Sequence, residues 1–226
     1  MPADPTASLS PAQRRSLETV LALLAEERAS VSSVTDERAW QVHVADSLTG
    51  LEVPELREAQ RIADVGAGAG FPGLVLAVAL PDAQVDLIES VSRKTAFITH
   101  AASKAGIPNA TALTTRSEDL AKAEGRESYD IVTARAVARL STLAELASPL
   151  LREGGVLVAW KGRRDAEEEQ QMDRASESLA MRPESILDVG GRAGSEHRHL
   201  HVIRKSASTP SNLPRKSGMA KKRPRG

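Results

Sequence analysis

The sequence predicts an α/β fold in which a mostly parallel sheet is closed by an antiparallel hairpin. From Arg61 onward, short β-like runs alternate with helical segments, as in βαβ units around a parallel sheet. A glycine-rich loop directly follows the first of these runs, and the last two runs are joined by a turn-like segment, 190–194. The 226 residues, 41% of them hydrophobic, suit one such domain with appendages.

Each element is predicted from periodicity and punctuation. Ser10 followed by Pro11 predicts a helix start, and apolar spacing continues that helix to about Arg28 and indicates another from about 36 to 50. Further helices are expected near 72–80, 92–105, 140–151 and 166–180. Strands are expected near 61–66, 84–89, 110–115, 129–134, 155–161, 184–189 and 198–204. The chain therefore divides into a helical N-terminal cap (1–57), a Rossmann-like domain (58–205) and a C-terminal tail (206–226).

Composition excludes several classes of protein. The absence of cysteine excludes disulfides, thiolate zinc sites and cysteine nucleophiles. No apolar stretch approaches the ~20 residues that span a bilayer, and a secretory signal pattern is missing, so we expect a cytoplasmic protein without a membrane partner. We also expect a monomer. His197, His199 and His201 alternate along one strand, but exposed histidines beside a basic tail are the simpler interpretation, and no metal is expected.

Charge is distributed unevenly along the chain. All 30 acidic residues lie at or before Glu196, whereas 204–226 contain eight basic residues and no acidic one. Because the whole chain is formally neutral, this end carries +8 and the remainder carries −8. A flexible basic tail suits a polyanion such as RNA, and a solvated tail without a partner is the alternative.

The loop after the first strand, Asp64-Val65-Gly66-Ala67-Gly68-Ala69-Gly70, indicates a ligand site. Alternating glycines let the backbone approach a ligand at the carboxyl edge of the sheet. Gly68 to Gly73 also fits the dinucleotide pattern G-x-G-x-x-G, but counted from Gly66, which ends the strand, Phe71 occupies the third glycine position. The loop instead resembles the D-x-G-x-G-x-G loop of class I S-adenosylmethionine-dependent methyltransferases, in which the acid orients the loop and the methionine moiety. S-adenosylmethionine is therefore the expected cofactor.

Two further positions fit this cofactor. Glu89 closes the second strand, where a carboxylate can accept hydrogen bonds from both ribose hydroxyls. Ser117, Glu118 and Asp119 follow the third strand, at the usual place for contacts to adenine. A capping cluster for the next helix is an equally open interpretation of these three residues.

The chain resembles the bacterial 16S ribosomal RNA guanine-N7 methyltransferases, the RsmG or glucose-inhibited division protein B family. The resemblance covers most of the chain and rests on 43–48, Phe71-Pro72-Gly73, 89–94, 133–136, Lys161-Gly162, and 214–218 with Lys222 and Pro224. Residues 28–35 replace the W-N-x-x-x-N-L-T pattern of the family. The resemblance implies methylation of a guanine in the 530 loop of 16S rRNA, with cofactor-binding positions at Gly66, Phe71, Ser117, Glu118 and Arg135.

Methyl transfer to guanine N7, the reaction that the resemblance implies, needs few catalytic groups from the protein. Guanine N7 has an in-plane lone pair and no hydrogen, so no general base is required and orientation is the main task. The Asn/Asp-Pro-Pro-aromatic motif of adenine amino-group methyltransferases is absent after the fourth strand. The catalytic residues stay unassigned, with Arg135 and Lys161 as candidates that could hold phosphate or guanine O6, or could form ordinary salt bridges.

The expected partner is 16S rRNA or the small ribosomal subunit, contacted by Lys94, Lys161, Arg215, Lys216 and Lys222. Deleting 206–226 should weaken RNA association and leave cofactor binding intact. Three rivals remain. A small-molecule methyltransferase is disfavoured by the basic tail, an NAD-dependent oxidoreductase by the closing hairpin and Phe71, and a non-catalytic RNA-binding protein by the intact loop and Glu89.

Overall fold

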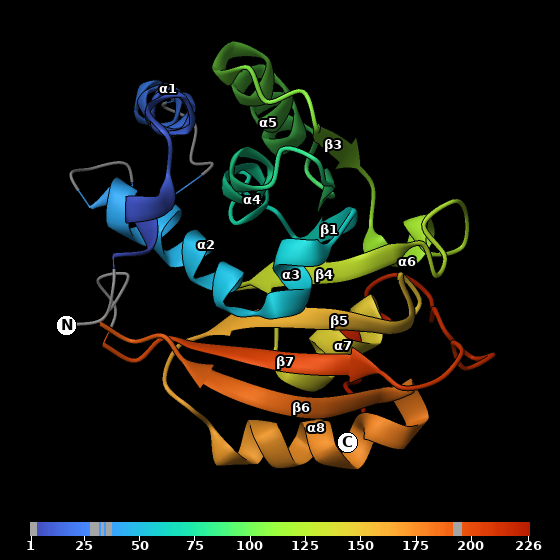
Figure 1. The fold of residues 1–226 in the computed structure, drawn as a ribbon. Coiled ribbons are helices and arrows are strands. Elements are labelled where there is room, and N and C mark those ends of the chain that lie inside the picture. Colours follow the sequence, from blue (N-terminus) through green and yellow to red (C-terminus); the bar gives the residue numbers. More distant parts are fainter. Residues whose placement is uncertain (1–3, 28–31, 33, 35–37, 192–195) are drawn as a thin grey trace.

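Seven strands form one sheet in the order β3-β2-β1-β4-β5-β7-β6 (Figure 1). The computed structural model describes residues 4–27, 32, 34, 38–191 and 196–226. Strand β7 runs antiparallel to both its neighbours, and the other paired strands are parallel. The predicted parallel sheet with a closing hairpin is therefore confirmed. The strands are β1 (Arg61–Val65), β2 (Gln84–Glu89), β3 (Ala110–Thr114), β4 (Tyr129–Arg135), β5 (Leu151–Lys161), β6 (Met181–Asp188) and β7 (His199–Lys205).

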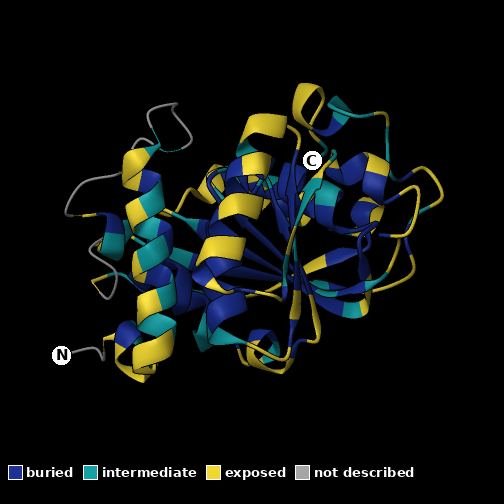
Figure 2. Ribbon diagram, turned by 90° about the horizontal axis from the view of Figure 1, so that it is seen from above, coloured by how far each residue is buried: buried dark blue, intermediate teal, exposed yellow. Residues whose placement is uncertain are grey.

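Helices cover both faces of the sheet and leave two apolar clusters, one on each face (Figures 1 and 2). One face is covered by α1 (Pro11–Glu26), α4 (Gly73–Ala79) and α5 (Ser92–Ala105), together with the chain that precedes β1. The other face is covered by α7 (Leu140–Ala147) and α8 (Ala166–Leu179). These helices lie close to the predicted positions because each has an apolar stripe that must be buried. The stripe of α1 is buried against α4 and α5.

The predicted helix over 36–50 differs in kind from what the structure contains. Residues 36 and 37 lie outside the described residues, and from Trp40 the chain forms a π-helical turn (Trp40–Ala45), then α2 (Asp46–Leu48) and a 3-10 turn (Thr49–Glu52). The indole Nε1 of Trp160 in β5 donates to the carbonyl oxygen of Asp46 at 2.9 Å, which fixes this segment against the sheet. In the described residues, four short elements are additional: a 3-10 turn (Pro5–Ser8), α3 (Pro54–Glu58), α6 (Ser117–Leu120) and α9 (Met219–Lys222).

The last 21 residues, expected from sequence to be flexible, are packed against the domain in the structure. The fully buried Lys205 ammonium donates to the carbonyl oxygens of Ser148 and Leu151 and to the Thr209 hydroxyl at 2.5–2.9 Å. The chain then passes α6 and α7 and ends beside α8, where Gln171 donates to the carbonyl oxygen of Arg225 at 3.3 Å (Figure 1). Acidic residues of the domain pair with basic residues of the tail. The net charge of each part does not by itself give the position of the tail.

Candidate functional site

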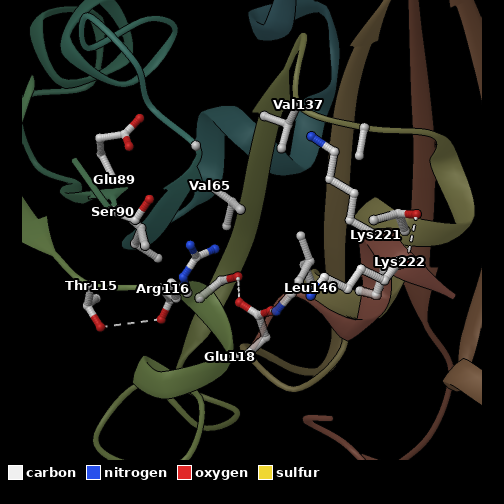
Figure 3. A pocket seen from close by; sticks show the side chains of 17 residues that line it. Val65, Glu89, Ser90, Thr115, Arg116, Glu118, Val137, Leu146, Lys221 and Lys222 are labelled. Atoms are coloured by element: carbon white, nitrogen blue, oxygen red, sulfur yellow. Dashed lines mark hydrogen bonds between the residues drawn. The ribbon is translucent and has the colours of Figure 1, made fainter. Parts of the chain in front are cut away.

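Two adjoining cavities open where the parallel strands end. The first, about 450 Å³, is lined by the ends of β1 and β2, by α6 and by the C-terminal residues, with Glu89 and Ser90 facing Lys221 and Lys222 across it (Figure 3). The second, about 250 Å³, is lined by the glycine-rich loop, Phe71 and Arg135. Gly66 and Glu89 line both cavities. This is the edge at which α/β sheets bind ligands, as the sequence predicts.

The glycine-rich loop adopts backbone conformations that require its glycines. Gly66, Gly68 and Gly70 have φ of +71°, +60° and +96°, in the left-handed region that L-residues with a side chain rarely occupy. A Cβ on Gly66 would also lie 2.7 Å from a methyl carbon of Val137. The loop therefore keeps its backbone exposed to the second cavity, which Gly66 and Gly68 both line.

Asp64 lies behind the loop and lines neither cavity. Its carboxylate is fully buried and accepts hydrogen bonds from the Gly73 amide (2.9 Å) and the Thr133 hydroxyl (3.0 Å). Burial raises the pKa of Asp64 to about 6, although both hydrogen bonds oppose the shift. The expected loop-orienting role suits this position, whereas direct contact with the methionine moiety does not, because both oxygens face protein groups.

Glu89 stands at the junction of the cavities. Its two carboxylate oxygens accept backbone hydrogen bonds from Gly68 (3.2 Å) and Val91 (2.9 Å), and Lys94 Nζ lies 3.9 Å away. Each oxygen keeps lone-pair capacity for another donor. The carboxylate thus fixes the loop and can still accept hydrogen bonds from a ligand at the junction.

Ser117 and Glu118 begin α6 at the wall of the first cavity, and Phe71 and Arg135 line the second. The Ser117 hydroxyl donates to the Glu118 carboxylate at 3.3 Å, and the other Glu118 oxygen accepts the Gly218 amide at 2.7 Å. The first amides of a helix have no partner within it, so α6 can still donate backbone hydrogen bonds to a ligand. The capping interpretation is wrong, because the N-cap position of α6 is Arg116 and no side chain caps the helix. The adenine-contact interpretation stays a prediction.

Arg135 is held in a cluster that the sequence does not predict. Its Nη1 donates to the carbonyl oxygen of Val42 (2.9 Å) and to the Asp46 carboxylate (2.8 Å), and its guanidinium lies 5.9 Å from the centre of the Phe71 ring. Asp46 is 1% exposed and accepts a second charged hydrogen bond, 2.6 Å long, from Arg198. Arg135 therefore forms a salt bridge and also lines the second cavity.

His43 completes this cluster, with its ring stacked on Phe71 at 4.4 Å between centroids. The Nε2 atom lies 2.8 Å from the carbonyl oxygen of Val34, so it carries the proton, and Nδ1 faces Arg135 Nη2 at 3.4 Å. Burial lowers the pKa of His43 and keeps the ring neutral. Of the divergent segment 28–35, only Ser32 and Val34 are described, and both contact His43.

The residues predicted to bind RNA do not gather in one place. Lys94 lines the second cavity, and Lys222 lines the first. Lys161 pairs with Glu168 at 2.7 Å and lines neither cavity, and Arg215 pairs with the buried Glu145 at 2.5 Å. Lys216 is exposed.

The interpretation of all three alternating histidines as exposed is wrong for one of them, because His201 is 5% exposed. Within the described ranges, no group of three or more His, Asp or Glu side chains is arranged to hold a metal ion. No helix in this part of the chain is long and apolar enough to cross a membrane.

The fold is that of the class I S-adenosylmethionine-dependent methyltransferases, and the two cavities lie at the carboxyl edge of its sheet. The chain belongs to the rRNA small subunit methyltransferase G family, whose profile matches residues 14–201. This membership confirms the resemblance found in the sequence.

Individual comparisons agree with this assignment. The ribosomal RNA small subunit methyltransferase G of Moorella thermoacetica is 35% identical over 96% of this chain and 92% of its own length. The protein of the same name from Pelotomaculum thermopropionicum is 38% identical over 94% and 90%. A SAM-dependent O-methyltransferase from Thermotoga maritima shares the fold, with a TM-score of 0.59, 14% identity, and coverage of 84% of this chain and 72% of that one.

Proposed function

We propose that this protein transfers the methyl group of S-adenosylmethionine to N7 of a guanine in 16S rRNA, in the 530 loop. The observation that carries the proposal is the pair of cavities that meet at Gly66 and Glu89, one beside α6 and one beside the left-handed glycines. The relatives named above are small-subunit rRNA methyltransferases, and both are matched over nine tenths of their length.

The residues fit such a cofactor in two parts. Ser117 and Glu118, in the first cavity, suit an adenine, and Glu89 at the junction suits the ribose hydroxyls. The loop, Phe71 and Arg135 around the second cavity suit the methionine end. S-adenosylmethionine, when bound, supplies an electrophilic methyl group on a sulfonium.

The protein groups around the second cavity serve to orient the acceptor. Guanine N7 attacks through a lone pair and releases no proton, so the neutral, stacked His43 is not needed as a base. Arg135 and Lys94 are the cations that line this cavity, and both can hold a phosphate or guanine O6. Positioning of this kind is worth several kcal/mol of the barrier.

The acceptor atom is tested with synthetic RNA of the 530 loop in which each guanine is replaced in turn by 7-deazaguanine. Transfer of labelled methyl should be abolished at one position and persist at the others, since carbon replaces the attacking nitrogen there. Methylation that survives every replacement would exclude N7. Methylation of no RNA, naked or in small subunits, would favour a small-molecule acceptor.

The cofactor site is tested by Glu89→Gln, which keeps the shape of the side chain and removes its charge. Charge-assisted hydrogen bonds contribute about 1.5–3 kcal/mol, so calorimetry should show S-adenosylmethionine affinity falling roughly 10- to 100-fold. Glu184→Gln, on the exposed strand β6, is the matched control and should bind normally. Equal affinities in the two variants would remove Glu89 from the site.

A further inference from the structure

The C-terminal segment (residues 215–225) lines the cavity assigned above to the adenosine part of the cofactor. Gly218, Ala220, Lys221 and Lys222 line this cavity. Figure 3 shows Lys221 and Lys222 on the opposite side of it from Glu89 and Ser90. The segment was expected to act on RNA alone. Four of its residues instead line this cavity.

Specific contacts hold the segment against the pocket wall. The Gly218 amide donates to Glu118 Oε1 at 2.7 Å, and the Ser217 hydroxyl lies 2.9 Å from both carboxylate oxygens of Asp119. On the other side, the Thr142 hydroxyl in α7 donates to the carbonyl oxygen of Ala220, whose side chain is 3% exposed. The segment therefore bridges α6 and α7 beside the cavity.

Glu145 in α7 clamps both ends of the segment. Its carboxylate is 3% exposed and accepts two hydrogen bonds of 2.5 Å from Arg215, and Arg225 Nε lies 3.8 Å away. Arg215 also donates to the carbonyl oxygen of Arg223 at 2.8 Å, which draws the ends of the segment together. A buried, bidentate carboxylate–guanidinium pair is among the stronger polar contacts in proteins.

We propose that the C-terminal segment is one wall of the cofactor pocket and that Glu145 is the positioning residue that holds this wall in place. The inference rests on the proposed function, because it takes the ligand of the first cavity to be S-adenosylmethionine. Removal of the wall exposes the bound adenosine to water. Binding of the cofactor in turn stabilises the closed position of the segment, since such coupling is reciprocal.

The test compares four full-length or shortened chains by calorimetry with S-adenosylmethionine: the unaltered protein, a chain ending at Pro214, Glu145→Gln and the control Lys216→Ala. Lys216 is exposed, lies in the same segment and lines neither cavity. Affinity should fall at least tenfold on truncation and severalfold in Glu145→Gln, and should be unchanged in Lys216→Ala. Affinities within twofold across all four chains would overturn the inference.

A second measurement needs no variant, so it decides the question even if the shortened chain does not fold. S-adenosylmethionine should slow tryptic cleavage of the unaltered protein after Lys216, Lys221 and Lys222, while cleavage after the exposed Arg163 between β5 and α8 should keep its rate. Equal slowing at all sites, or at none, contradicts a wall that closes on the ligand. An unaltered protein that binds no S-adenosylmethionine would instead refute the proposed function, and this inference with it.

Discussion

Asp46 joins three parts of the chain that are distant in sequence. Its side chain binds Arg135 at the end of β4 and Arg198 just before β7, and its own backbone carbonyl accepts the Trp160 indole. Because the carboxylate is 1% exposed, two guanidinium groups compensate the cost of burying it. The position of Arg135 beside the second cavity therefore depends on a residue that touches neither cavity.

Replacement of Asp46 by asparagine should remove one charged acceptor and leave two cations poorly paired. We expect a loss of about 1.5–3 kcal/mol of unfolding free energy, measured by urea denaturation, and slower methyl transfer. Glu169→Gln is the matched control, since its partner Arg164 is 54% exposed and surface pairs contribute at most about 1 kcal/mol. Similar losses in the two variants would show that burial of Asp46 is unimportant.

Asp64 gives a pH-dependent prediction. Its pKa of about 6 in the folded protein exceeds the usual 3.8, so the folded state binds this proton more tightly than the unfolded state does. Stability from this group is complete below about pH 4 and is lost as pH rises towards 6, by up to about 3 kcal/mol. Urea denaturation at several pH values should show the unaltered protein losing stability over this window relative to Asp64→Asn. Parallel pH curves for the two proteins would contradict the shift.

Among the elements, α1 shows how the N-terminal cap is attached to the domain. Ser10 and Gln13 form a reciprocal capping box, and the Gln13 side chain also donates to the carbonyl oxygen of Val78 at 2.8 Å, at the end of α4. The helix that follows the glycine-rich loop is thus covered by α1. The loop itself is fixed from the other side by Asp64 and Glu89.

Loss of the capping box at the start of α1 should lower the stability of the fold and leave the two cavities unchanged. Ser10→Ala removes the acceptor of the Gln13 amide and should cost about 1 kcal/mol of unfolding free energy, with cofactor affinity unchanged by calorimetry. Ser8→Ala, in the exposed turn just before it, is the control and should cost a few tenths of that. A fall in affinity would mean that α1 positions the loop directly.

The whole molecule separates charge between an acidic domain and a basic end. Arg215 and Arg225 are already paired with Glu145, whereas Lys216, Lys221, Lys222 and Arg223 are exposed. The cations available to a polyanion in residues 206–226 are therefore fewer than the charge count implies, and Lys221 and Lys222 also line the first cavity.

Substitution of these four exposed cations by alanine should reduce the salt dependence of RNA binding. Each lost phosphate contact lowers the slope of log affinity against log salt by about 0.7–0.9, so the slope should fall by roughly 3. Arg152→Ala is the control. Arg152 lies at the amino end of β5, away from the carboxyl ends of the parallel strands, so this variant should keep the slope. An unchanged slope in the fourfold variant would mean that these cations do not contact RNA.

Much of the site was predictable because its signals are local. The glycines after β1 reflect a backbone that needs left-handed φ at alternate positions, and Glu89 follows from where the next strand ends. His43, in contrast, belongs to a π-helical turn, and a sequence period of 3.6 cannot distinguish that turn from an α-helix. Its stacking on Phe71 is therefore a finding of the structure.

The strands, most of the helices and the glycine-rich loop could be predicted from local patterns, because apolar periodicity and glycine stereochemistry act over a few neighbouring residues. The motifs that indicate the family are local in the same way. Tertiary structure alone decided which charges meet. Arg198 reaches Asp46 across 152 positions and Arg215 reaches Glu145 across 70. The charge composition does not say where the charged residues lie in the fold. From sequence, the basic end is therefore expected to be a flexible tail. Packing places a buried carboxylate within its reach and makes it part of the pocket.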